Sequence, residues 1–399
     1  MSAITRRVIV IATALPRWIS DFAEVSTALA AAGHRVELWF PRDNGLPGAG
    51  WDGKQAIDAA RATLPLGVST RSLPFTRNRG PLSIAKLTLA SLICARAACR
   101  ERDGLFILWS ALSVIIAGPW VRLFGRRGMY LITGLGAAFS ARQRNSFVTK
   151  LICLVYRYAF SSDRAIVIVH NHEDKAELVA HAGVMPERVI VTGGCGVRPE
   201  DFSYRAALSH PPRPTILVPG RLLRDKGVME AAQASGILSG RGVAHRMIFT
   251  SNAMSGRDDA LNADELARAA AHPDVEFVGF QPDIAALYRE ADLVCIASWY
   301  REGLQTALLE SAASGCPLVV CDNVGVRDFM RDDVEGLIVP PRDAAAIADA
   351  LERLVREPET AERLRVAAYR RYRSGFTRDH MLDATLAGLR SIGVATASA

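Results

Sequence analysis

The chain has 399 residues, of which 50% are hydrophobic and 22% are charged, and this composition excludes disordered and fibrous proteins. One hydrophobic core rarely supports 399 residues, so the length predicts two or three domains. The seven cysteines show neither paired CxxC spacing nor ligand-like histidines beside them, which predicts neither a zinc site nor a disulfide framework. Reduced thiols in a cytosol are therefore expected.

The formal net charge of +7 is unevenly distributed. Residues 1–200 carry 25 Lys and Arg against 14 Asp and Glu, whereas residues 201–399 carry 23 against 27. A basic front half suits an anionic partner, such as nucleic acid, acidic lipid or a phosphorylated substrate. A surface that simply favours arginine explains the same counts without a partner.

Short β-branched runs alternate with helical patterns, and the first run, in "RRVIVIATAL", is too short for a signal peptide and is typical of a strand. Strands are expected within residues 7–15, 34–40, 105–110, 129–134, 164–170, 188–194, 214–220, 245–251, 275–280, 293–298, 317–322 and 336–340. A helix is expected over residues 21–33, and helical patterns continue from Asp343 to the end. This alternation predicts parallel-sheet α/β domains.

Residues 105–121 contain no charge and approach the minimum length of a membrane span. Gly118 and Pro119 interrupt the stretch, so we expect a strand at 105–109, a turn at Ser110 and a largely buried helix to about Phe124. Membrane insertion is the alternative.

A proline-rich polar segment without periodicity, residues 198–214, is expected to link two domains. The N-terminal domain would then cover residues 1–197 and the C-terminal domain residues 215–375.

In open α/β sheets, ligands bind beyond the carboxyl ends of the strands. The expected strand at 214–220 ends at Gly220, and Arg221, Arg224 and Lys226 follow it. This loop lacks the GxxxxGK[ST] pattern of a Walker A motif, but a guanidinium and an ammonium so placed can neutralise a diphosphate. Solvated loop charges are the alternative.

The stretch "REGLQTALLE" follows another expected strand and opens a helix that is closed by Gly315. Glu302 would lie at the mouth of this helix and Glu310 about two turns along it. The amides of Gly303, Leu304 and Gln305 would then be free donors at the positive helix end, which suits phosphate. A rise of ~1.5 Å per residue separates the two carboxylates by up to ~12 Å, the reach from a sugar through a diphosphate to a ribose. Glu302 is therefore expected to hold sugar hydroxyls and Glu310 ribose hydroxyls.

The pair Glu302-x7-Glu310, the following "SAASGCPLVVCDNVGVRDFM" and the upstream "GRLLRDKG" resemble the donor half of retaining GT-B glycosyltransferases of family 4. The front half is similar to a branch of that family that extends lipid-linked saccharides for capsule, O-antigen, exopolysaccharide or glycoprotein glycans. The motifs that carry this second likeness are Thr133 to Gly136, Tyr156-Arg157, Asn171 to Asp174 and Gly194 to Val197.

The resemblance implies a GT-B fold, in which two Rossmann-like parallel-sheet α/β domains face a central cleft and residues 376–399 pack back on the N-terminal domain. It implies transfer of a hexose or N-acetylhexosamine from a UDP-sugar to a polyprenyl-diphosphate-linked saccharide in bacterial surface glycan synthesis, with retention of anomeric configuration. No metal or other cofactor is expected. The enzyme would be cytoplasmic and peripheral on the inner face of the plasma membrane.

The resemblance also assigns roles to residues. Arg221, Lys226 and Glu302 form the implied catalytic set, with the two cations stabilising the charge on the departing β-phosphate. The implied donor-binding residues are Gly220, Gly279, Phe280, Gly303, Leu304, Gln305 and Glu310. The uracil would lie near Gly279 and Phe280.

The chain departs from the family pattern in two places. It has "TGLG" where many relatives carry a histidine, so no general base is assigned there, and Asp328 stands where relatives often have glutamate. Gly134 and Gly136 either let a sugar approach the backbone or only form a tight turn. Asn171 and His172 are candidates for the acceptor site, with a surface or capping role as the alternative for His172.

Basic residues are interspersed with aromatic and aliphatic residues in 74–80 and 141–160, which suits docking on anionic lipid. The basic residues are Arg77, Arg79, Arg142, Arg144, Lys150 and Arg157. Packing of the apolar face of 147–160 on the sheet is the alternative. No nucleic-acid partner is expected.

Three rival functions follow from the same residues. A glycosyltransferase with a soluble sugar acceptor would need no membrane. A UDP-sugar epimerase would share the two-domain fold and would also bind UDP. A catalytically silent scaffold would not need both glutamates. A dehydrogenase is disfavoured because GxGxxG is absent after the first strand.

Overall fold

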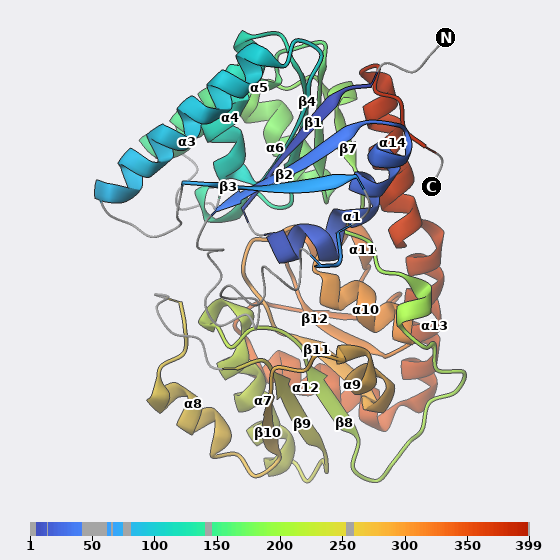
Figure 1. The fold of residues 1–399 in the computed structure, drawn as a ribbon. Coiled ribbons are helices and arrows are strands. Elements are labelled where there is room, and N and C mark those ends of the chain that lie inside the picture. Colours follow the sequence, from blue (N-terminus) through green and yellow to red (C-terminus); the bar gives the residue numbers. More distant parts are fainter. Residues whose placement is uncertain are drawn as a thin grey trace. The chain divides into compact units, whose positions relative to one another are not determined.

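A computed structural model describes residues 5–13, 15–41, 62–64, 67–74, 81–139, 146–252 and 259–397. These residues form two compact units, each built on its own parallel sheet (Figure 1). The first unit contains the described residues up to Cys195 together with those from Asp379 onward, and the second contains Gly196–Arg378.

The first unit is built on a seven-stranded sheet in the order β3-β2-β1-β4-β5-β6-β7, with every neighbouring pair parallel. The strands are β1 (Arg7–Ala12), β2 (Arg35–Pro41), β3 (Val68–Leu73), β4 (Leu105–Trp109), β5 (Arg127–Ile132), β6 (Ala165–Val169) and β7 (Val189–Val191). The central strands β4 and β6 are buried along their whole length, as expected when helices cover both faces of a parallel sheet.

Helices cover both faces of this sheet. On one face lie α3 (Pro81–Arg100), α4 (Ala111–Leu123), α5 (Phe147–Phe160) and α6 (His172–Ala182). On the other lie α1 (Leu15–Ala31) and α14 (Arg378–Ser391). Short 3-10 turns occur at Gly136–Phe139 and Pro186–Arg188.

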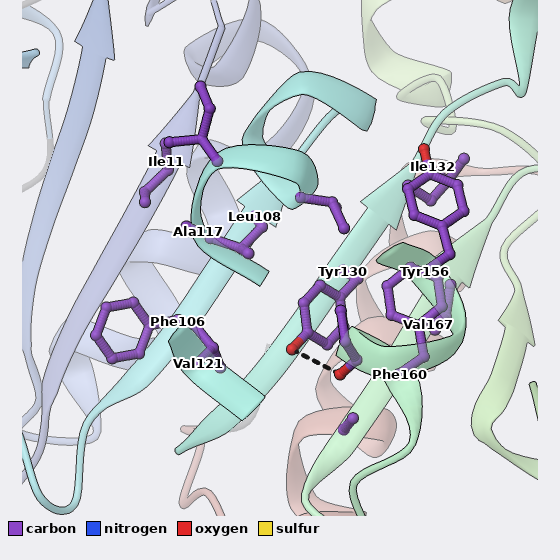
Figure 2. Close-up of a cluster of buried hydrophobic side chains, with 14 of the residues drawn as sticks. Ile11, Phe106, Leu108, Ala117, Val121, Tyr130, Ile132, Tyr156, Phe160 and Val167 are labelled. Atoms are coloured by element: carbon purple, nitrogen blue, oxygen red, sulfur yellow. Dashed lines mark hydrogen bonds between the residues drawn. The ribbon is translucent and has the colours of Figure 1, made fainter. Parts of the chain in front are cut away.

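Aromatic side chains fill the core under α5. Figure 2 shows Tyr130, Tyr156 and Phe160 in this cluster, where the ring of Phe160 lies 4.7 Å from that of Tyr130 and 5.1 Å from that of Tyr156. The hydroxyl of Tyr130 is satisfied because it donates a hydrogen bond to the carbonyl oxygen of Ala159 at 3.1 Å. Tyr156, part of a sequence motif, is thus a core residue.

The uncharged stretch 105–121 forms the strand and helix predicted from its sequence. Ser110 sits between β4 and α4 with φ of 97°, and its side chain caps α4 by accepting from the amide of Ser113. Within the described part of the chain, no helix combines the length and the apolar character that crossing a bilayer requires.

The end of the chain belongs to the first unit. On α14, Met381, Leu386 and Leu389 are buried in the same cluster as residues of β1 and β2. A Cβ on Gly388 would lie 2.4 Å from Cδ1 of Ile190, so the glycine allows the helix to approach the sheet closely.

The second unit is built on a six-stranded parallel sheet in the order β10-β9-β8-β11-β12-β13. Its strands are β8 (Thr215–Val218), β9 (Arg246–Thr250), β10 (Val275–Gly279), β11 (Leu293–Ile296), β12 (Leu318–Cys321) and β13 (Leu337–Val339). Its α-helices are α7 (Val228–Gly240), α8 (Ala263–Ala270), α9 (Ile284–Glu290), α10 (Thr306–Ser314), α11 (Val324–Phe329), α12 (Ala344–Arg356) and α13 (Pro358–Gly375), and 3-10 turns occur at Pro199–Asp201 and Arg224–Lys226. Helices α7, α8 and α12 pack on one face and α9, α10 and α11 on the other, and α13 contributes buried residues to both cores.

The predicted linker, residues 198–214, is fixed to the second unit. The guanidinium of Arg365, which is fully buried on α13, donates to the carbonyl oxygens of Arg205 and Ala206 at 2.7 and 3.1 Å. Arg205 in turn pairs with Asp292 at 3.4 Å. The segment therefore packs as part of a domain, although its composition is that of a tether.

Candidate active site

The strand order of the second unit places a topological switch point between β8 and β11. From β8 the chain proceeds outward to β9 and β10, then crosses back to β11 on the other side of β8. The loops after β8 and β11 therefore diverge at the carboxyl edge of the sheet, where α/β proteins bind ligands. Both predicted site motifs lie on these two loops.

Main-chain contacts lock the two loops together. The carbonyl oxygen of Asp225 accepts hydrogen bonds from the amides of Trp299 and Tyr300 at 3.0 and 3.2 Å. Gly227 adopts φ of 71°, and a Cβ there would lie 2.1 Å from the carbonyl oxygen of Ala297. Only glycine fits this position, since both its backbone conformation and its surroundings exclude a side chain.

An ion pair joins two of the predicted catalytic residues. The ammonium of Lys226 donates to Oε1 of Glu302, and the hydroxyl of Ser298 lies 3.5 Å from the same oxygen. The side chains are 16% and 26% exposed, so both charges remain within reach of a ligand. The fold thus brings together an ammonium that can bind phosphate and a carboxylate that can bind hydroxyls.

The other two cations of the first loop differ in role. Arg224 forms a two-bond ion pair with Glu265, whose hydrogen bonds of 2.7 and 2.6 Å hold the pKa of that carboxyl below its usual value. Glu265 also completes the capping box of α8, so Arg224 is a structural residue. Arg221 is half-buried and has no ion pair within the part of the chain that the structure describes, which leaves its guanidinium available to a ligand.

Helix α10 begins two residues later than its sequence predicts. Gln305 is the N-cap residue in an extended conformation, and the first helical amides belong to Thr306 and the two residues after it. Leu304 is 5% exposed and packs in the core, and the chain bends at Gly303 and Leu304 before the helix begins. The amides of Gly303 and Leu304 therefore precede the helix and that of Gln305 lies at its N-cap, so the three predicted donors lie before the first helical residue.

Glu310 is held by a residue that the sequence did not indicate. Tyr288, fully buried on α9, donates a hydrogen bond from its hydroxyl to Oε2 of Glu310 at 2.9 Å. Burial raises the pKa of Tyr288 well above its usual value, so the hydroxyl remains protonated and a donor. This bond fixes the orientation of the Glu310 carboxylate.

Gly279 and Phe280 lie at the end of β10, on the same edge of the sheet as Gly220. Gly279 has φ of 72°, and the side-chain oxygen of Asn252 accepts a hydrogen bond from the amide of Phe280 at 3.1 Å. The ring of Phe280 is exposed, as a surface that stacks on a base needs to be. The amide of Gly220 donates to the hydroxyl of Thr250 at 3.1 Å, and a Cβ on Gly220 would meet nothing within 4 Å.

Three buried polar atoms on the two loops have no hydrogen-bond partner among the described residues. They are Oδ1 of Asp225, Nε1 of Trp299 and Nε2 of Gln305. Buried polar groups in native proteins nearly always have a partner. Burial also raises the pKa of Asp225, with Asp259 adding to the effect. These three polar atoms can therefore hydrogen-bond a ligand that binds between the two loops.

The candidates in the first unit lie at the carboxyl ends of β5 and β6. Asn171 is fully buried and caps α6, accepting from the amide of Asp174 at 2.7 Å and donating to its carboxylate at 3.1 Å. His172 is exposed at the first position of α6. Gly134 is half-buried, and Gly136 has φ of 63° at the start of a 3-10 turn, as a tight turn requires.

The predicted lipid-contacting residues are only partly described. Lys150 and Arg157 are exposed on α5. Arg77, Arg79, Arg142 and Arg144 lie outside the described residues. In the described ranges, no cluster of three or more His, Cys, Asp or Glu side chains is arranged to hold a metal ion.

Sequence comparison places the site within a known family model. Residues 213–357 match the model described as glycosyl transferases group 1, and this segment contains every predicted donor-site residue. The amylovoran biosynthesis glycosyltransferase AmsK of Erwinia amylovora is 32% identical over 181 residues, which cover 43% of each chain. The N,N'-diacetylbacillosaminyl-diphospho-undecaprenol alpha-1,3-N-acetylgalactosaminyltransferase of Campylobacter jejuni is 23% identical over 61% of this chain and 64% of its own. The chain spans about two fifths of the length of several curated relatives that it matches.

Structural comparison extends the likeness to both units. The Anabaena protein HepE, solved in complex with UDP-glucose, aligns with 97% of this chain and 100% of its own, with a TM-score of 0.74 and 15% identity. Residues 213–357 are thus similar in sequence to glycosyl transferases group 1, and the chain, with its two Rossmann-like parallel-sheet domains, has the GT-B fold.

Proposed function

We propose that this protein is a retaining glycosyltransferase that moves a hexose or N-acetylhexosamine from a UDP-sugar to a polyprenyl-diphosphate-linked saccharide in bacterial surface glycan synthesis. The Lys226–Glu302 pair at the switch point of the second unit is the observation that carries this proposal. It combines a cation for phosphate with a carboxylate for sugar hydroxyls inside the segment that matches glycosyl transferases group 1.

The diphosphate would bind between the two loops. The first amides of α10, from Thr306 on, are donors at the positive end of a helix. The guanidinium of Arg221 and the ammonium of Lys226, which also contacts Glu302, are further donors beside it. The unpartnered amide group of Gln305 is a further donor at this helix end. A doubly anionic group is thereby matched without a metal ion, and we propose that the reaction requires none.

The two glutamates would hold the ends of the donor. Glu302 lies beside Lys226 and would accept hydrogen bonds from the transferred sugar. Glu310, oriented by Tyr288, would accept from the ribose hydroxyls. The exposed ring of Phe280 would contact the uracil. That HepE was solved with UDP-glucose supports a donor of this class for the shared fold.

The chemistry follows from this placement. The bond between the anomeric carbon and the β-phosphate oxygen breaks, and UDP departs carrying negative charge that Arg221 and Lys226 stabilise. The acceptor oxygen attacks the anomeric carbon from the face that UDP leaves, and its proton passes to the departing phosphate oxygen. Configuration is retained because the new bond forms on the face where the old one broke.

One relative supports a lipid-linked acceptor, since it is named for a diphospho-undecaprenol substrate. Another relative, named for amylovoran biosynthesis, supports a role in polysaccharide synthesis. An acceptor with a polyprenyl tail lies in a membrane, so we propose that the enzyme is cytoplasmic and peripheral on the inner face of the plasma membrane. The exposed cations Lys150 and Arg157 would face anionic lipid there.

The test is an assay of the purified protein with a panel of UDP-sugars and a short polyprenyl-diphosphate monosaccharide. The expected product is one sugar heavier, has the anomeric configuration of the donor and forms equally well in EDTA. Transfer to free sugars but not to the lipid-linked saccharide would show that the acceptor is a soluble sugar. Conversion of a UDP-sugar to its epimer in the absence of acceptor would identify an epimerase, and no change in any substrate would refute the proposal.

A further inference from the structure

The first unit exposes an unusual set of apolar side chains. Ten of the thirteen large hydrophobic residues that are exposed among the described residues lie on α3, α4 and α5. They are Ile84, Leu89 and Leu92 on α3, Ile115 and Leu123 on α4, and Phe147, Val148, Leu151, Leu154 and Tyr158 on α5. Scattered exposed hydrophobic residues are normal, but this concentration on three helices marks an interaction surface.

The three helices form one layer on the same face of the sheet, and Figure 1 shows them side by side. Ser91 of α3 donates to the carbonyl oxygen of Ile116 on α4 at 2.9 Å, and Arg122 of α4 donates to Ser161 at the end of α5 at 2.9 Å. Because all three helices bury their inner sides in one core, their outer sides share one surface. We refer to the ten exposed side chains on this surface as the apolar ridge.

Helix α5 is apolar on two sides. Tyr156, Ala159 and Phe160 pack in the core. Phe147 and Leu154, with Leu151 and Tyr158, recur at intervals of three and four residues on the exposed side, and Phe147 is 81% exposed. A surface helix of a soluble protein normally presents a polar outer face. Packing on the sheet therefore explains the apolar residues on the inner side of α5 but not those on its outer side.

The charged side chains on the three helices that carry the apolar ridge are all positive. Helices α3, α4 and α5 contain no Asp or Glu. Their cations are Lys86, Arg96, Arg100, Arg122, Lys150 and Arg157. Apolar side chains flanked by cations complement an anionic lipid surface, where the apolar groups enter the acyl boundary and the cations meet phosphates. A symmetric dimer through this ridge would instead bring the same cations together, which is unfavourable.

We propose that the apolar ridge inserts into the headgroup layer of an anionic bilayer, with Phe147, Leu151 and Leu154 entering to a depth of about 5–10 Å. Insertion makes attachment depend on apolar area as well as on charge. The ridge lies on helices that carry none of the donor-site residues, so membrane attachment and donor binding are expected to fail separately.

The test is flotation of the full chain with vesicles of phosphatidylcholine alone or mixed with phosphatidylglycerol, at low and high salt. We expect binding to the mixed vesicles that weakens in high salt but persists. The double variant Leu151→Asp with Leu154→Asp is expected to lower the partition coefficient at least tenfold. Lys86→Gln with Lys150→Gln is expected to lower it severalfold and to reduce its salt dependence.

Met185→Asp is the matched control, because Met185 is 46% exposed in the same unit but off the ridge. It is expected to bind vesicles like the parent chain. UDP affinity and thermal unfolding of each variant, measured on the same preparations, should be unchanged since these side chains are exposed. Absent binding, equal binding to phosphatidylcholine alone, or unaltered binding of the Leu151→Asp, Leu154→Asp chain would overturn the proposal. If the parent chain forms a dimer and the Leu151→Asp, Leu154→Asp chain does not, the ridge is a protein interface and not a membrane-binding surface.

Discussion

Lys226 and Glu302 are 76 positions apart in the chain and form an ion pair that ties the loop after β8 to the loop after β11. The pair presents opposite charges to the same point at the carboxyl edge of the sheet. Because a nucleotide sugar joins an anionic diphosphate to a neutral, hydroxyl-rich ring, adjacent cationic and anionic side chains match the two parts of such a ligand.

Removal of each partner is expected to have a different effect. Lys226→Ala should lower turnover by roughly 10²–10³-fold and weaken binding of UDP, because it removes charge stabilisation of the departing phosphate. Glu302→Gln should lower turnover but leave UDP affinity within a few fold, since this carboxylate faces the sugar. Initial rates and UDP calorimetry measure both effects.

Arg246→Gln is the control for these two variants. Arg246 forms an exposed ion pair with Glu276 in the same unit, and such pairs contribute little to stability. Near-normal turnover of Lys226→Ala would refute the assignment of the catalytic cation.

The hydrogen bond between Tyr288 and Glu310 predicts that the chain prefers nucleotides that carry ribose hydroxyls. The parent chain should bind UDP roughly 10–100-fold more tightly than 2′,3′-dideoxy-UDP, because a charged acceptor gains that much from hydroxyl donors. Glu310→Gln should largely abolish this preference. Tyr288→Phe should weaken it severalfold and lower the free energy of unfolding by about 1 kcal/mol. Equal preference in the parent chain and Glu310→Gln would show that Glu310 does not contact the ribose.

Gly227 predicts a sharp dependence of stability on one methyl group. Gly227→Ala should destabilise the second unit by roughly 2–4 kcal/mol, since the new Cβ would adopt a left-handed conformation and overlap the carbonyl oxygen of Ala297. Gly240→Ala is the control, because nothing lies within 4 Å of its Cβ position at the end of α7. It should be neutral or stabilising by up to ~1 kcal/mol. Urea unfolding measures both, and similar midpoints would contradict the account of this loop.

Burial of Asp225 predicts a pH dependence of stability. Because desolvation raises the pKa of its carboxyl, the folded protein holds the proton more tightly than the unfolded chain. The contribution of Asp225 to the free energy of unfolding should therefore increase as the pH falls from neutral through the raised folded-state pKa. Asp225→Asn should remove this contribution. Urea unfolding at a series of pH values tests it, and identical profiles for the two chains would count against it.

Much of the fold follows from local sequence patterns. All twelve predicted strands are present, because β-branched runs in buried parallel strands leave a clear signal. Strand β3, "VSTRSL", was missed since it is an edge strand that is largely exposed and carries few apolar residues. Helix α1 begins at Leu15, before the predicted start at Asp21, because two helical segments join across a kink at Phe22, whose φ is −139°.

The rule for open sheets singles out Lys226 and Glu302 as candidates, because each lies in a loop that follows a strand. Tyr288 lies on a helix and its role depends on tertiary packing, which no spacing reveals. Arg224 resembled Arg221 in sequence, and only its ion pair with Glu265 separates a structural cation from one that remains available.

Calorimetric titration of the purified chain with UDP tests the central claim most directly. Binding to one site per chain is expected, weakened at least tenfold by Lys226→Ala and preserved in the Leu151→Asp, Leu154→Asp variant. Absence of UDP binding, or binding that Lys226→Ala leaves unchanged, would contradict the assignment of the β8 and β11 loops as the donor site.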